Sequence, residues 1–285
     1  MENATESSNG GSKAEGTSLG SILITLQSLI LFFASAGNLV VLMILYLHRK
    51  RRRLARVNLF ILHLCVADLA VAMFNVAPNL CEIVSFPEPC FLKTSSSACK
   101  IMQYLTVVSV YGSTYILVVT AVDRFLAIRF PLWAQRLTDR HAHIMAAVAW
   151  SLAFTFSVPQ IIIFKYDTNS SLCEPSWSSD LSQHIRRENI YIAWFASAVW
   201  ILPTIIMAIC YVTITCVVVC RGQSLLKDGG KTMSIHQKSN RSIMRKRLLK
   251  PVRLTLAVVV GYILCWSPWM LATMLFQYGG IRESE

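Results

Sequence analysis

Six apolar runs constrain this chain more than any other feature, because each is long enough to cross a lipid bilayer as a helix. A helix rises about 1.5 Å per residue, so roughly 20 apolar residues span the hydrocarbon core. In lipid every backbone polar group must find a partner inside the protein, and a single run meets that requirement as a helix. The runs cover about residues 20–47, 57–84, 99–122, 143–164, 190–220 and 251–277. Prolines within them are expected to mark kinks or ends, at Pro78, Pro159, Pro203 and Pro268. The expected fold class is therefore all-α, a membrane helical bundle over residues 20–277.

Composition agrees with a membrane protein. The chain is 54% hydrophobic and only 15% charged, with a mean hydropathy of +0.51, whereas a soluble domain carries about 25% charged residues. Residues 1–19 are polar and lack a short apolar region followed by a small-residue cleavage site. We therefore expect them to form an extracellular tail, not a cleavable signal peptide, and we expect residues 278–285 to form a short C-terminal tail.

The basic residues predict the orientation. They lie in HRKRRRLAR after the first span, at Arg129, Arg136 and Arg140 after the third, and in the loop from Arg221 to Lys250 after the fifth. Loops rich in lysine and arginine face the cytoplasm, so the N-terminus is expected outside. The candidate glycosylation sites Asn3 and Asn169 then fall on the outer face. Most of the net charge of +12 lies on the inner face, where it can bind anionic lipid. Nucleic acid is a poor partner, because these loops lie against a membrane.

Two cysteines on the expected outer face are candidates for a disulfide. Cys99 opens the third span and Cys173 lies in the loop between the fourth and fifth. Both are in the oxidising compartment, and a bond between them would fasten that loop over the third helix. Cys81 and Cys90 could form a second pair, but we expect them to be free thiols.

Polar residues within the spans are candidate functional residues, because an ionisable group at membrane depth is costly. They are Asp68 in the second span, Asn38 in the first and Ser113 in the third. A carboxylate, an amide and a hydroxyl at similar depth could hold water or a small hard cation such as sodium. The alternative is a hydrogen-bonded structural contact between helices, with no cofactor.

Short motifs in each span resemble those of the rhodopsin-like (class A) G protein-coupled receptors. They are Gly37-Asn38, NLFILHLCVADLA, Cys99 with the later DRF, Trp150, Pro203 with Tyr211, and CWSPW. The resemblance implies a structural polar core of Asn38, Asp68, Ser113, Trp150 and Pro203. Within the class, KIMQYLTVVSVYGSTYILVVTAVDRFLAI and AWSLAFTFSVPQIIIF are similar to the neuropeptide receptors of the vasopressin/oxytocin, neuropeptide S and crustacean cardioactive peptide group, with gonadotropin-releasing hormone and adipokinetic hormone receptors as near relatives.

The resemblance implies a switch at the inner end of the third helix. Asp123 would hold Arg124 in the inactive state and release it to a heterotrimeric G protein in the active state, although Phe125 replaces the family's tyrosine. No second acid occurs at the inner end of the sixth helix, so Asp123 is expected to be the main restraint. The alternative is an interfacial ion pair that only anchors the helix.

The sixth span would supply the moving part of this switch. Pro268 is expected to kink the helix and let its inner end swing outward. Trp266 resembles the indole that senses ligand at the base of the pocket, or it simply fills the kink. Tyr211 matches the tyrosine that packs towards the motif arginine in the active state.

The pocket is expected to take a short extracellular peptide. An amine receptor would carry an aspartate two turns into the third helix, where this chain has Thr106. Gln103 lies one turn above Thr106 on the same side. The expected ligand-binding residues are Asn75, Asn79, Glu82, Gln103, Thr106, Glu174, Phe195, Trp266 and Trp269.

Other protein classes fit less well. We find no internal repeat or filter-like loop of a transporter or channel. An intramembrane enzyme is also disfavoured, because His63, His141 and His143 are scattered and no HExxH, GxSxG or paired aspartates occur.

The resemblance fails after the sixth span, where FQYGGIRESE contains neither a seventh apolar run nor an Asn-Pro-x-x-Tyr motif. We therefore expect a bundle of the seven-transmembrane receptor type with only six spans, which couples weakly or not at all to a G protein by itself. The alternative to a signalling receptor is a truncated form that dimerises with a full-length receptor and regulates it as a dominant-negative partner. The expected location is the plasma membrane, or the endoplasmic reticulum for a genuine six-helix form.

Overall fold

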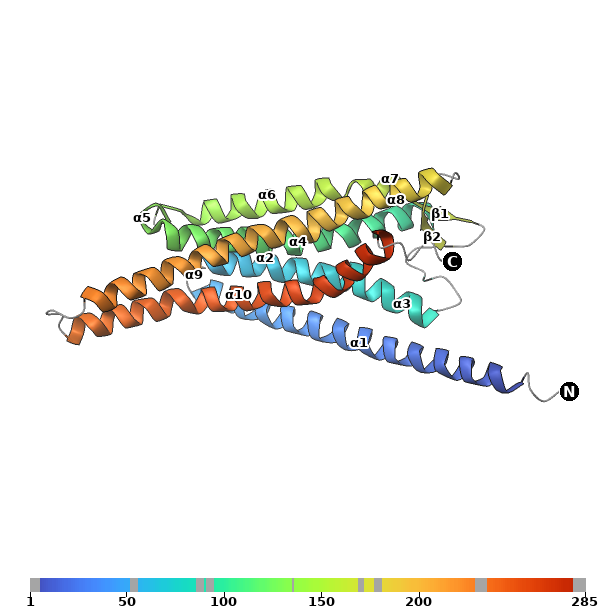
Figure 1. The fold of residues 1–285 in the computed structure, drawn as a ribbon, viewed down its shortest axis with the longest axis horizontal. Coiled ribbons are helices and arrows are strands. Elements are labelled where there is room, and N and C mark those ends of the chain that lie inside the picture. The colour runs from blue at the N-terminus through green and yellow to red at the C-terminus, as the bar shows by residue number, and fades with distance from the viewer. Residues whose placement is uncertain are drawn as a thin grey trace. The chain divides into compact units, whose positions relative to one another are not determined.

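Helices make up most of the computed structural model, which describes residues 6–51, 56–85, 90, 95–134, 136–168, 172–176, 181–228 and 235–278 (Figure 1). In chain order the elements are α1 (Glu6–Arg51), α2 (Arg56–Val71), η1 (Ala72–Val76), α3 (Ala77–Ser85), α4 (Ser96–Arg129), α5 (Pro131–Ala134), α6 (Asp139–Ser157), α7 (Pro159–Ile163), β1 (Phe164–Asp167), β2 (Leu172–Pro175), α8 (Leu181–Ala196), η3 (Ser197–Ile201), α9 (Leu202–Asp228) and α10 (Ile235–Tyr278). The elements η1 and η3 are single π-helical turns that continue into the next helix.

Six helical stretches of the described chain are long and apolar enough to cross a membrane. They are Gly20–Leu47, Arg56–Ser85, Ser96–Arg129, Asp139–Ile163, Gln183–Cys220 and Leu256–Phe276. Each overlaps one of the predicted spans, so the all-α membrane class is confirmed. Two helices extend well beyond their apolar run: α1 begins at Glu6 and α10 at Ile235. Extending an existing helix adds one hydrogen bond per residue fixed, which is far easier than starting a new helix.

The prolines within the spans have different local effects. Pro78 and Pro203 each lie two residues after a π-helical turn, η1 and η3 respectively. Pro159 starts α7 immediately after the break that ends α6. Pro268 lies inside α10, which is helical on both sides of it. Proline lacks the N–H that the preceding turn requires, and π-turns and helix ends are two ways of accommodating that loss.

The chain divides into two units, and three helices contribute to both. The first unit comprises Met1–Arg53, Leu62–Ser113 and Ala153–Ser176. Within it α1 packs against η1 and α3, and α7 leads into an antiparallel hairpin that pairs β1 with β2, from Phe164 opposite Pro175 to Asp167 opposite Leu172.

The second unit comprises Leu54–Ile61, Thr114–Leu152 and Trp177–Glu285. Its helices α8 and α9 are joined through η3, and α10 packs against η3 and α9, as Figure 1 shows for the paired α9 and α10 ribbons.

Helix α4 is more deeply buried than the other spans. In α4, 61% of the apolar window is buried, against 28% or less in each of the other five. Outward-facing residues elsewhere are large and apolar, including Phe32 and Phe33 on α1. Such side chains suit contact with lipid, which is as apolar as they are.

Candidate functional site

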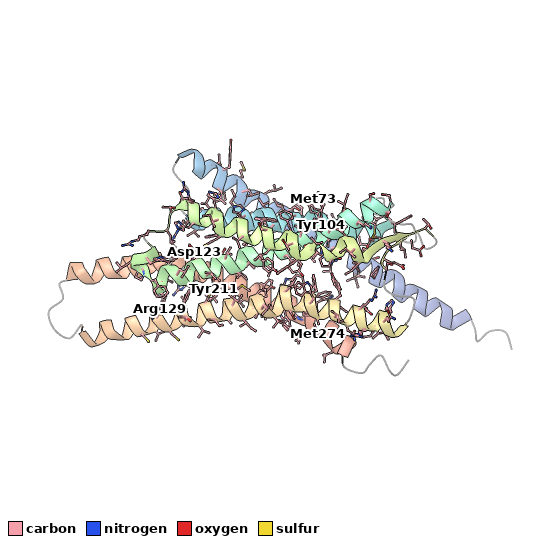
Figure 2. The ribbon with its side chains drawn as sticks, turned by 90° about the horizontal axis from the view of Figure 1, so that it is seen from above. Met73, Tyr104, Asp123, Arg129, Tyr211 and Met274 are labelled. Carbon is pink, nitrogen blue, oxygen red and sulfur yellow. A yellow bond between two sulfur atoms is a disulfide. The ribbon has the colours of Figure 1, made fainter. Side chains whose placement is uncertain are left out.

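A buried carboxylate between two arginines lies near the end of α4. Asp123 is 1% exposed and Arg124 is 7% exposed. Arg124 donates a hydrogen bond from Nη2 to Asp123 Oδ2. Arg56, the first residue of α2, places its Nη1 3.8 Å from the other carboxylate oxygen, Asp123 Oδ1. Figure 2 shows Asp123 together with Arg129, which lies further along the same helix. The motif acid is therefore shared between its sequence neighbour and an arginine from another helix.

Arg56 also contacts the backbone that follows α4. Its Nη1 lies 3.5 Å from the carbonyl oxygens of Ala134 and Leu137, at the end of α5 and in the turn after it. One guanidinium thus joins α2, the motif acid and this connecting segment. Arg56 was not among the predicted site residues, because a basic stretch before the second span indicates only orientation. The available signal was its position: it is the basic residue adjacent to the apolar run.

The predicted switch residues on α9 and α10 belong to the same unit as Asp123. Tyr211 is buried on α9 (Figure 2). On α10, Trp266 makes an edge-to-face contact with Trp269, with ring centroids 5.9 Å apart. Trp266 also lies 6.3 Å from the ring of Tyr262, one turn earlier. These three rings form a continuous aromatic stripe along α10, and Trp269 at its end is 55% exposed.

Two disulfides lie in the first unit. Cys99 is bonded to Cys173, with the Cα atoms 5.6 Å apart, as predicted. This bond attaches β2 to the first turn of α4. Cys81 is bonded to Cys90, with the Cα atoms 5.7 Å apart, so the expectation of two free thiols was wrong. A separation of nine residues lets Cys90 return to the last turns of α3, and this proximity could not be seen from the sequence.

Several residues predicted to bind ligand lie close to these disulfides or to η1. Gln103 places its Nε2 4.0 Å from Cys173 Sγ, beside the exposed Glu174. Asn79 donates from Nδ2 to Asn75 Oδ1 at 3.3 Å, and Glu82 is exposed on the same helix, α3.

Thr106 uses its hydroxyl within the protein. Its Oγ1 donates to the carbonyl oxygen of Phe74 in η1 and lies 2.8 Å from the carbonyl oxygen of Met102. The residues predicted to bind ligand are divided between the two units. Thr106 and the other polar candidates belong to the first unit. The remaining three, Phe195, Trp266 and Trp269, belong to the second, where Phe195 lies 6.4 Å from the ring of Tyr191.

The predicted polar core is only partly brought together. Ser113 donates from Oγ to Asp68 Oδ1 at 2.7 Å, which joins α4 to α2. Asn38 instead donates from Nδ2 to the carbonyl of Ala34 in its own helix, at 2.9 Å. Trp150 lies in α6, and Pro203 is buried just after η3. Among the described residues, no group of three or more histidines, cysteines or carboxylates could hold a metal ion. The predicted glycosylation sites Asn3 and Asn169 lie outside the described residues.

Comparisons with known proteins agree with these motifs. Residues 37–285 match the family model "7 transmembrane receptor (rhodopsin family)". The chain is 33% identical to cephalotocin receptor 1 of Octopus vulgaris, over 88% of this chain and 68% of that protein. It is 31% identical to the annetocin receptor of Eisenia fetida, over 89% of this chain and 71% of the relative. It is 30% identical to the mesotocin receptor of Rhinella marina, over 96% of this chain and 70% of the relative. On these grounds this multi-pass membrane protein belongs to the rhodopsin family of seven-transmembrane receptors.

Proposed function

We propose that this protein is a receptor for an extracellular peptide hormone of the vasopressin/oxytocin type. The observation that carries the proposal is its similarity to receptors named for cephalotocin, annetocin and mesotocin, at 30–33% identity over at least 88% of this chain. The membrane-spanning helices suit a plasma-membrane location, and the basic loops favour an N-terminus outside the cell.

The peptide would bind first to the polar residues around the disulfide-tethered hairpin. Glu174 is exposed next to Cys173 in the chain, and the amide nitrogen of Gln103 on α4 lies 4.0 Å from Cys173 Sγ. Asn75 and Asn79 present amide groups on η1 and α3. Amide side chains both donate and accept hydrogen bonds, so they suit the backbone of a short peptide. Thr106 provides no charge for a small amine, which supports a peptide over an amine ligand.

Signalling would change the partner of Arg124. In this conformation Arg124 is held by Asp123, while its Nε is buried without a hydrogen-bond partner among the described residues. A buried donor without an acceptor is destabilising, so a conformation that brings another acceptor within hydrogen-bonding distance of Arg124 is favoured. We propose that ligand moves α10 outward at Pro268, and that Arg124 then leaves Asp123 for a heterotrimeric G protein while Tyr211 packs beside it.

Asp68 and Ser113 would hold a sodium ion, because a carboxylate and a hydroxyl are the oxygen donors that hard cations take. The ion would supply positive charge between α2 and α4.

The test is saturable binding of labelled, disulfide-cyclised and amidated peptides of this type to cells that express the chain. We expect Glu174→Gln to weaken binding by about tenfold, because it removes one charge-assisted hydrogen bond at an exposed position. Asp167→Asn on the opposite strand of the hairpin is the matched control and should bind normally. Surface expression without displaceable binding of any peptide in the panel would contradict the proposal.

Calcium and cyclic nucleotide responses in the same cells separate signalling from binding. A response that depends on peptide supports a signalling receptor. Binding without any response, together with reduced surface level of a co-expressed full-length receptor, supports the regulatory alternative.

A further inference from the structure

Two prolines within the spans remove a backbone donor from the helical turn that precedes them. A carbonyl accepts a hydrogen bond from the N–H four residues later in an α-turn and five residues later in a π-turn, and proline has no N–H. Pro78 therefore offers no donor to the carbonyls four and five residues before it, one of which belongs to Phe74, and Pro203 offers none to the corresponding carbonyls, one of which belongs to Val199. Phe74 lies in the π-helical turn η1 and Val199 in the π-helical turn η3. In a bilayer no water is present to replace the lost donors, so another protein group must do so.

In each case the replacement is a hydroxyl from a neighbouring helix. Thr106 on α4 donates from Oγ1 to the carbonyl oxygen of Phe74. Tyr262 on α10 donates from Oη to the carbonyl oxygen of Val199. The first pair lies wholly within the first unit and the second pair wholly within the second.

A third hydroxyl acts in the same way at the break before Pro159. There the N–H of Val158 donates to the carbonyl of Thr155, three residues earlier, at 3.3 Å. Tyr104 on α4 donates from Oη to the carbonyl oxygen of Phe154 at 3.1 Å (Figure 2 shows Tyr104). The same solution therefore recurs at three helix irregularities, with donors on two different helices.

Each of the two hydroxyls has a second possible partner, and the bonding of that partner shows where the hydroxyl proton is most useful. The Thr106 hydroxyl carries one proton and is also 2.8 Å from the carbonyl of Met102. Met102 precedes Thr106 by four residues in an uninterrupted helix, so its carbonyl already has the backbone N–H of Thr106. The residue four positions after Phe74 is Pro78, which has no N–H to offer its carbonyl, and the proton therefore stabilises the protein more when it points to Phe74. Tyr262 is similarly constrained, since its hydroxyl also hydrogen-bonds to Thr114 on α4 while it donates to Val199.

We propose that Thr106 and Tyr262 are positioning residues that complete the backbone of the two proline-broken turns. Thr106 fixes η1 against α4, and thereby places Asn75 and Asn79, which lie in η1 and just after it. Tyr262 fixes α10 to η3 one turn before Trp266. Movement of α10 must then either break this hydrogen bond or carry η3 with it. The assignment does not depend on which ligand binds, or on whether the chain signals.

Double-mutant cycles with the prolines test the proposal on the full chain in lipid nanodiscs. Thr106→Val and Tyr262→Phe should each lower the melting temperature by about 2–4 °C. In the Pro78→Ala background Thr106→Val should have a clearly smaller effect, because the introduced alanine supplies an N–H four residues after Phe74. Tyr262→Phe should likewise have a clearly smaller effect in the Pro203→Ala background. Thr106→Ser keeps the hydroxyl and should melt close to the parent.

The matched control is Thr120→Val. Thr120 is another buried threonine on α4, but its Oγ1 donates to the Ile116 carbonyl of its own helix, which already has a backbone donor. We expect a smaller shift from Thr120→Val, and we expect hydrogen exchange of residues 72–79 to rise only in Thr106→Val. Equal shifts in melting temperature with and without the prolines, or no rise in hydrogen exchange of residues 72–79, would overturn the proposal. If Pro203→Ala does not fold, the Pro78 cycle and the Thr106→Ser comparison decide the result.

Discussion

At the scale of single residues, Asp123 is the most deeply buried of the described charged groups. It is almost fully buried and has arginine nitrogens at both carboxylate oxygens. Burying such charges is costly, so the pair contributes little net stability compared with apolar residues of the same shape. Removing only one partner is different, because it leaves an uncompensated buried charge. Replacing Asp123 is therefore expected to cost more stability than replacing Arg56, whose side chain is 19% exposed.

We expect Asp123→Ala to cost about 3–5 kcal/mol of stability, because the buried Arg124 would lose its carboxylate. Arg56→Gln should cost on the order of 1 kcal/mol, since its charge is further from Asp123 and can reach water. Thermal unfolding in nanodiscs measures both, with Arg56→Lys as the control that keeps the charge. Equal losses for Asp123→Ala and Arg56→Gln would show that Arg124 does not depend on Asp123. If the proposed switch is right, Asp123→Ala also raises ligand-independent signalling.

Sequence reasoning found the residues whose chemistry is unusual for their position and missed those whose chemistry is ordinary. Asp68 and Ser113 were predicted from polarity at membrane depth, and the structure brings them to 2.7 Å. Arg56 was missed because one arginine in a basic run looks like its neighbours. Tyr262 was missed because a tyrosine in an apolar span is normally core, and its acceptor is a backbone carbonyl on another helix. Contacts of that kind are set by packing and leave no local pattern.

At the scale of elements, the two disulfides constrain the chain to different degrees. The Cys99–Cys173 bond closes a loop of 74 residues, whereas Cys81–Cys90 closes one of nine. In the chain-entropy treatment these closures stabilise by about 4 and about 3 kcal/mol respectively. The longer closure also holds the β1–β2 hairpin to α4, beside Gln103.

We therefore expect Cys99→Ser with Cys173→Ser to lower the melting temperature more than Cys81→Ser with Cys90→Ser. Peptide binding should be lost in the first double variant and weakened in the second. Cys216→Ser is the matched control, because Cys216 is an exposed free thiol on α9. Unchanged binding after loss of the Cys99–Cys173 bond would show that the hairpin does not shape the site.

Helices were predictable as elements, but their irregularities were not. Length and hydropathy identified each span because the bilayer imposes a minimum apolar run. The same reasoning expected kinks or ends at the prolines, yet Pro78 and Pro203 follow π-turns while Pro268 lies within continuous helix. The local sequence supplies only the missing N–H. Contacts with neighbouring helices also contribute, such as the hydroxyl donors Thr106 and Tyr262 beside the two π-turns, and such contacts are not encoded in the local sequence.

At the scale of the whole molecule, charge and hydropathy together imply one orientation. Basic residues are concentrated in the loops after the first, third and fifth spans, and the net charge is +12. Lysine and arginine are retained on the cytoplasmic side during insertion, so this pattern predicts that the N-terminus and the β1–β2 hairpin lie outside. Both disulfides would then lie in the oxidising compartment, where such bonds persist. The proposed peptide site and the proposed G protein site would consequently lie at opposite ends of α4.

Glycosylation mapping tests this orientation directly. We expect Asn3 and Asn169 to be glycosylated, because only acceptors on the outer face meet the modifying enzyme in the lumen. Asn3→Gln and Asn169→Gln should each remove one glycan, seen as a step in gel mobility that glycosidase treatment abolishes. Gly230→Asn is the control: it creates the acceptor triplet Asn-Lys-Thr in the basic loop between α9 and α10, and it should remain unmodified. Modification at position 230 with none at the native sites would mean that the basic loops lie outside, and the peptide and G protein ends would have to be exchanged.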